Sequence, residues 1–116
     1  MTLRPSFSRA LLAVAGVFVV IMALLPYPPA VPITGDKHQH MLAFGTLTIL
    51  SVAAFPQTPL LRIGERLLFL GAMIEVVQSI PALNRTCDIM DWVADTAVVI
   101  AVLAAVALYR QRSSAT

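Results

Sequence analysis

The stretch Gly71–Asp95, GAMIEVVQSIPALNRTCDIMDWVAD, decides the fold because it places charged residues inside and between two apolar runs. Its polar and charged residues of interest are Glu75, Gln78, Arg85, Asp88, Asp91 and Asp95. A charged group that faces lipid is costly, so the charges that persist in membrane helices usually face the interior of a bundle and mark function. The stretch therefore predicts two helices that share a polar interior surface.

The composition of the whole chain places it among membrane proteins. Hydrophobic residues make up 59% of the 116 residues and charged residues 12%. A soluble chain has about 45–50% and about 25%, respectively. Most of the surface must therefore meet lipid. We predict one all-α integral membrane domain spanning residues 1–116, with no second domain.

Prolines divide the rest of the chain into four apolar segments. All eight prolines fall at or beyond the segment ends, where helix-breaking residues belong. We expect helices at about 9–26, 37–55, 63–80 and 88–109, each close to the about 20 residues needed to cross a bilayer. The first segment could instead be the core of a secretory signal peptide. Its unbroken run from Ala10 to Leu25 exceeds the usual length of about 7–15 residues, which favours a retained helix.

The distribution of cations predicts the orientation of a four-helix membrane bundle. Two cations, Lys37 and Arg85, fall on one side of it. The other side carries Arg4, Arg9, Arg62, Arg66, Arg110 and Arg112. Since cytoplasmic loops carry the excess of Lys and Arg, both termini should be cytoplasmic. In that orientation Trp92 is expected near the outer interface and Tyr109 near the inner one, as in an aromatic belt.

Helical spacing gathers the polar residues on three faces. On the second helix the face consists of Lys37, His40, Phe44, Thr48 and Ser51. On the third helix it consists of Gly64, Leu68, Gly71, Glu75 and Gln78, where the glycines would let a neighbouring backbone approach. On the fourth helix it is the stripe Asp88, Asp91 and Asp95. A further stripe, Ala97, Ala101 and Ala105, predicts a packing surface for another helix or for a second copy in a homo-oligomer.

These faces should point at one another and form an acidic polar cup at the outer end of the bundle. The polar cup comprises Asp36, Lys37, His40, Glu75, Gln78, Arg85, Asp88, Asp91 and Asp95. Its five carboxylates outnumber its two permanent cations. That surplus requires a bound cation, protonated carboxyls or charged histidines.

The same residues resemble the signatures of the VanZ-like family. GDKHQHMLAFGTL resembles the pattern DKxxH…(F/Y) that opens the family's second helix, matched by Asp36, Lys37, His40 and Phe44. The stretch from Gly71 to Thr96 resembles GxxxExxQ…P…R…DxxDxxxN, matched by Gly71, Glu75, Gln78, Pro81, Arg85, Asp88 and Asp91. Asp95 stands where the family generally has Asn, and Val98 where it usually has Gly.

The family takes its name from a protein linked to resistance to teicoplanin, a lipoglycopeptide antibiotic. The resemblance implies a multi-pass protein of the bacterial inner membrane that belongs to the cell envelope. It carries over no molecular activity.

The residues of the polar cup leave several chemistries open. His40, Glu75 and Asp91 could hold a divalent metal such as zinc or manganese, or His40 could hydrogen-bond Glu75 as a polar lock. Glu75 and Asp91 could act as an acid/base pair on an activated water. Arg85 and Lys37 could hold the phosphate or carboxylate of a lipid head group, or Arg85 could pair with a neighbouring aspartate.

Three functions follow from these alternatives. The first is a non-enzymatic envelope protein that binds a polar or cationic head group, that of a lipid-linked envelope precursor or of a lipoglycopeptide. The second is a metal-dependent membrane hydrolase or transferase acting on a lipid-linked substrate. The third treats the cluster as interhelical glue. Binding to nucleic acid is excluded, since the net charge is only +2 with no basic block.

Overall fold

The structure, a computed structural model, consists of four helices. It describes residues 4–24, 36–80 and 89–115, without the side chains of 36–40 and 114–115. The helices are α1 (Pro5–Leu24), α2 (Asp36–Ala54), α3 (Leu60–Gln78) and α4 (Ile89–Ala115). This confirms the all-α prediction, and the described ranges contain no strand.

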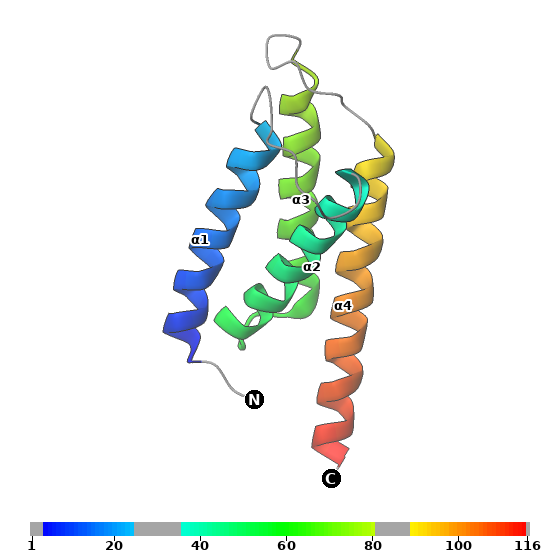
Figure 1. Ribbon diagram of the computed structural model, residues 1–116. Coiled ribbons are helices and arrows are strands. Elements are labelled where there is room, and N and C mark those ends of the chain that lie inside the picture. Colours follow the sequence, from blue (N-terminus) through cyan, green and yellow to red (C-terminus); the bar gives the residue numbers. More distant parts are fainter. Residues whose placement is uncertain (1–3, 25–35, 81–88, 116) are drawn as a thin grey trace.

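Two helices are longer than the apolar segments alone indicate. α1 begins at Pro5 rather than near residue 9, because proline is well suited to the first position of a helix. α4 continues through the polar segment RQRSSA to Ala115, since that segment contains neither glycine nor proline to stop it. The last turns of α4 project past the other helices (Figure 1).

The helices pack so that α2 lies between α1 and α4. It crosses the bundle diagonally, while α3 lies behind it and packs against α4 along much of its length (Figure 1). Both ends of the chain lie at the same end of the bundle. The four predicted segments therefore form an up-down bundle with α2 at its centre.

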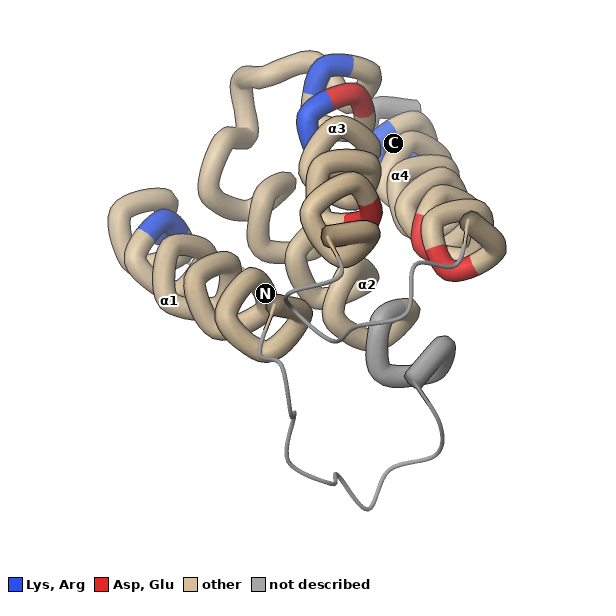
Figure 2. The backbone as a smooth tube through the Cα atoms, turned by 90° about the horizontal axis from the view of Figure 1, so that it is seen from above, with Lys and Arg blue, Asp and Glu red and all other residues tan. Residues whose placement is uncertain are grey.

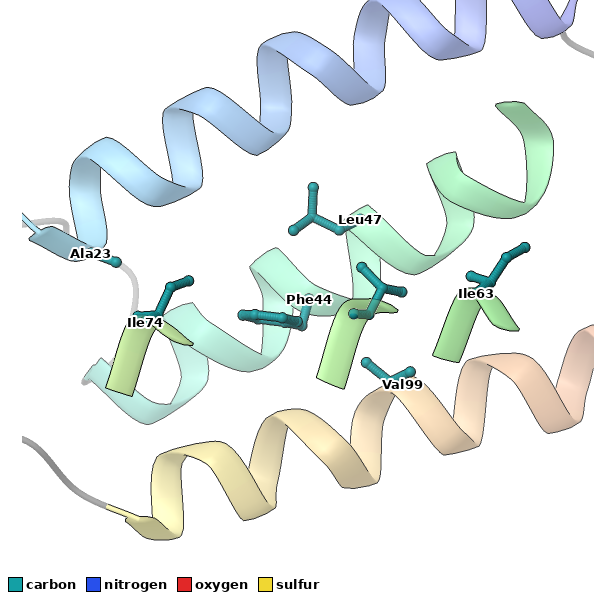
Figure 3. Packing of buried hydrophobic residues seen from close by; sticks show 7 residues of the cluster. Ala23, Phe44, Leu47, Ile63, Ile74 and Val99 are labelled. Carbon is teal, nitrogen blue, oxygen red and sulfur yellow. The ribbon is translucent and has the colours of Figure 1, made fainter. Parts of the chain in front are cut away.

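The core lies where α2, α3 and α4 meet (Figure 3). Phe44 and Leu47 of α2 are each 1% exposed, and Phe44 points toward α3 (Figure 3). The rest of the cluster is Ala23, Ile63, Leu67, Ile74 and Val99. Such buried side chains hold the helices through close packing rather than through polar contacts.

Outside this core, the surface is largely apolar. Val14 and Phe18 of α1 and Phe69 of α3 are 70%, 63% and 67% exposed. By length and composition, α1 and residues Ile89–Ser113 of α4 could each cross a membrane. α2 contributes a shorter apolar portion, Met41–Ala54.

Polar contacts fasten α1 at both of its ends. Near its start, Arg9 donates a hydrogen bond from Nε to the carbonyl oxygen of Ala54 over 3.0 Å. The same guanidinium lies 4.9 Å from the ring centroid of Phe55, within reach of a cation–π interaction. Near the other end, Gln78 Nε2 donates to the carbonyl oxygen of Ala23 over 2.7 Å. Between these contacts, most of the large apolar side chains of α1 face outward.

Candidate functional site

Most of the acids of the described helices lie toward one end of the bundle, and the arginines lie toward the other. In the view down the bundle, the acidic segments of α3 and α4 near the end opposite the termini lie on sides that face each other (Figure 2). They contain Glu75 on α3 and Asp91 and Asp95 on α4. The arginines of α1, α3 and α4 lie toward the end that holds the termini, together with Glu65.

The buried face of α3 matches the predicted one. Gly64, Gly71, Glu75 and Gln78 are all buried, and Leu68 is half-buried. Glu75 is 5% exposed and Gln78 is 2% exposed, although both belong to a helix whose opposite side is open. As the helical periodicity predicted, these two polar side chains face the interior of the bundle.

The acidic stripe of α4 also turns inward. Asp95 is 3% exposed and Asp91 is half-buried. Asp91 lies in the first turn of α4, where the helix dipole favours a negative charge. Asp95 lies one turn further into the bundle and is the most buried acid of the described residues.

Trp92 packs between α3 and α4, and its predicted place in an outer aromatic belt stays a prediction. Its indole Nε1 donates a hydrogen bond to the carbonyl oxygen of Leu68 over 3.0 Å, and the side chain is half-buried. A Cβ atom at Gly71 would lie 3.1 Å from Trp92 Cδ1 and 3.5 Å from Phe44 Cζ. The missing side chain of Gly71 makes room for the ring, and the carbonyl satisfies its polar N–H.

The glycines of α3 therefore serve a different purpose from the one predicted. At Gly64, a Cβ atom would lie 2.9 Å from Leu103 Cδ1. Both glycines admit large side chains of α4, whereas the sequence pattern predicted the close approach of a neighbouring backbone. The space beside each glycine is accordingly filled by a side chain of α4.

The described part of the predicted polar face of α2 is buried. Phe44, Thr48 and Ser51 are buried, which confirms this part of the predicted face. Thr48 donates its hydroxyl hydrogen to the carbonyl oxygen of Phe44 over 2.6 Å, within its own helix. Its hydroxyl proton is thus already used and is not directed at the acids of α3 and α4.

The remaining members of the polar cup have no described side chains. Asp36, Lys37 and His40 lie in the first turns of α2, and Arg85 and Asp88 lie between α3 and α4, outside the described residues. Their convergence with Glu75 and Asp91 stays a prediction. The structure brings four of the nine predicted residues to one end of the bundle: Glu75, Gln78, Asp91 and Asp95.

Gln78 has a structural contact that spacing did not predict. Its amide nitrogen is engaged by α1 through Ala23, while its buried Oε1 has no hydrogen-bond partner. The nitrogen donates to a carbonyl in the last turn of α1, where the carbonyl oxygens have no N–H donor within the helix. The side-chain oxygen of Gln78, like the oxygens of an ionised carboxylate, is a hydrogen-bond acceptor.

The described residues form no metal centre by themselves. Among residues 4–24, 36–80 and 89–115, no group of three His, Cys, Asp or Glu side chains with described positions could hold a metal ion. The predicted metal site requires His40, whose side chain lies outside the described set. The metal-binding and hydrolase hypotheses consequently stay predictions.

Sequence reasoning missed the contacts of Arg9 and Trp92. In the sequence, Arg9 contributed only to the predicted orientation of the helices across the membrane. In the structure it contacts the end of α2 and the ring of Phe55. No local pattern indicates either contact. Ala97, Ala101 and Ala105 of α4 are exposed within the chain, so their predicted role in an oligomer stays a prediction.

Comparisons with protein-family models, with curated proteins and with solved structures found no match to this chain. The resemblance to the VanZ-like family therefore rests on the two sequence motifs, at Asp36–Phe44 and Gly71–Asp91.

Proposed function

We propose that the chain is a multi-pass protein of the bacterial inner membrane with both termini in the cytoplasm. The two termini lie at one end of the bundle, and six arginines belong to that end. An excess of cations near the termini is typical of the cytoplasmic side. The exposed apolar side chains of α1, α3 and α4 provide a surface suited to lipid.

This orientation predicts how the chain reacts with a membrane-impermeant thiol reagent. Cys87 is the only cysteine, and in the sequence it falls between α3 and α4, on the side opposite the termini. In spheroplasts the reagent should label Cys87 from outside. In a Cys87→Ser background, Gln57→Cys in the turn between α2 and α3 should react only after the membrane is permeabilised. Labelling of position 57 and not of position 87 in intact spheroplasts would reverse the orientation.

The proposed activity is the binding of a polar or cationic head group in the polar cup, without catalysis. The observation that carries it is the burial of Glu75 and Asp95, which are 5% and 3% exposed. Acidic residues inside the helices of a membrane bundle are rare, and those that occur there usually mark function. The acceptor atoms that they and Gln78 offer suit a ligand that is positively charged or rich in N–H and O–H donors.

The VanZ-like resemblance and the outward direction of the polar cup indicate the source of such a head group. It would belong to a lipid-linked envelope precursor or to an amphiphilic antibiotic. Binding of teicoplanin, which carries both an acyl chain and polar groups, would give the protein a part in glycopeptide resistance.

Charge-neutral variants of the acids test the binding proposal. The full chain in lipid nanodiscs is titrated with teicoplanin and, separately, with a lipid-linked wall precursor. We expect Glu75→Gln and Asp91→Asn each to weaken the binding of the true ligand at least about tenfold, because each removes one charge from a desolvated contact.

Glu65→Gln is the matched control, since Glu65 is an exposed acid at the other end of the same helix. It should leave the affinity unchanged, and thermal unfolding of each variant identifies those that have lost their fold. Unchanged affinity for every ligand in well-folded Glu75→Gln and Asp91→Asn variants would refute the proposal. Equal losses of folding stability and binding would instead show that the acids stabilise the packing of the helices.

A further inference from the structure

A second face of α3 carries a stripe of exposed residues that has no part in the polar cup. The α3 stripe comprises Arg62, Arg66, Phe69, Met73 and Val76, which recur at the spacing of one helix side. All five are exposed, with Phe69, Met73 and Val76 at 67%, 43% and 60%. Glu75 and Gln78 lie on the opposite, buried side of α3. Changes to the stripe therefore leave the polar cup untouched.

The charged end of the stripe suits a phosphate group. Arg62 and Arg66 lie one turn apart with the exposed Glu65 between them, which leaves a net positive charge at this end of α3. Within the described part of the chain, neither guanidinium forms an ion pair with a carboxylate. The planar fork of arginine binds two phosphate oxygens at once, which the point charge of lysine does not.

The part of the stripe from Arg66 to Val76 has the length of one lipid leaflet. With a rise of about 1.5 Å per residue, Val76 lies about 15 Å along the helix axis from Arg66. That is half of the about 30 Å hydrocarbon core of a bilayer. A lipid whose phosphate lay at the two arginines would therefore extend its acyl chain past Phe69 and Met73 to Val76.

We propose that the α3 stripe binds an anionic phospholipid of the leaflet on the side of the chain termini. Arg62 and Arg66 hold its phosphate, and the three apolar side chains contact its acyl chain. Charge complementarity selects an anionic lipid over a zwitterionic one, whose positive group would be repelled by the same arginines. The inference rests on the proposed membrane location and is independent of what the polar cup binds.

Native mass spectrometry of the full chain in a neutral detergent tests the site. The protein is titrated with phosphatidylglycerol and, separately, with phosphatidylcholine of the same acyl chains. We expect about tenfold tighter binding of phosphatidylglycerol, the ratio expected for one additional charge-assisted contact. The double variant Arg62→Gln/Arg66→Gln should bind both lipids equally weakly. Inorganic phosphate should not displace the bound lipid, because it lacks the acyl contacts.

The double variant Arg110→Gln/Arg112→Gln is the matched control. It removes the same charge from the same end of the bundle, on α4, and should retain the preference for phosphatidylglycerol. Equal affinity of the wild-type chain for both lipids, loss of the preference in the α4 double variant, or displacement of lipid by inorganic phosphate would each overturn the α3 site.

A carbonate wash of membranes separates this test from that of the membrane location. Release of the chain into the supernatant would refute the membrane location itself. A chain that stays in the membrane fraction but shows no lipid preference in the titration would refute only the α3 site.

Discussion

Replacing Phe44 with alanine is expected to lower the free energy of unfolding by about 3 kcal/mol, the lower end of the range for such a change in a core. Phe44 is 1% exposed, and it lies where α2 meets α3 with its ring against the bare backbone of Gly71. Truncation would leave a cavity between the two helices. The lower end of the range applies in the proposed membrane location. There the unfolded helices would stay in an apolar environment, so the loss of packing contacts would dominate over the cost of transferring the side chain to water.

Unfolding in mixed micelles with increasing sodium dodecyl sulfate, followed by the fluorescence of Trp92, measures this loss. Phe18→Ala on α1 is the matched control, because Phe18 is 63% exposed and does not belong to the core cluster. It should change the free energy of unfolding by less than about 0.5 kcal/mol. A Phe44→Ala variant as stable as the Phe18→Ala variant would contradict the packing of α2 on α3.

Gly71→Val is expected to lower the free energy of unfolding by about 2 kcal/mol through overpacking. Even a Cβ atom would lie 3.1 Å from Trp92 Cδ1, and the two further methyl carbons of valine need more room. The indole cannot easily give way, since its Nε1 is hydrogen-bonded to Leu68. The added side chain would therefore force α3 and α4 apart.

Gly16→Val is the control, because nothing lies within 4 Å of a Cβ atom built at Gly16. A second variant tests the cause directly. Gly71→Val combined with Trp92→Ala should be less destabilised than the sum of the two single variants, since the alanine makes room for valine. Here circular dichroism replaces fluorescence as the readout, and additive losses would show that Trp92 and Gly71 are not in contact.

Several features of the fold follow from local patterns and could be predicted. The prolines of the described residues lie at helix starts or between helices, because proline lacks the backbone donor that a helix interior needs. Spacing of 3.6 residues per turn turned Glu75, Gln78 and Asp95 inward together with the glycines of α3. The extension of α4 to Ala115 was not predicted. The predicted helix end rested on the length of the apolar run, and the residues after Tyr109 are polar.

The amino-acid sequence by itself determined four helices, their order, and the polar side of α3 and of the start of α4. All of these depend on the periodicity and composition of one segment at a time. Only the tertiary structure decided which residues form hydrogen bonds between helices. Arg9 with Ala54, Gln78 with Ala23 and Trp92 with Leu68 are separated by 45, 55 and 24 residues. Such pairs depend on how each helix is rotated and crossed against its neighbours, which is settled by packing across the whole bundle.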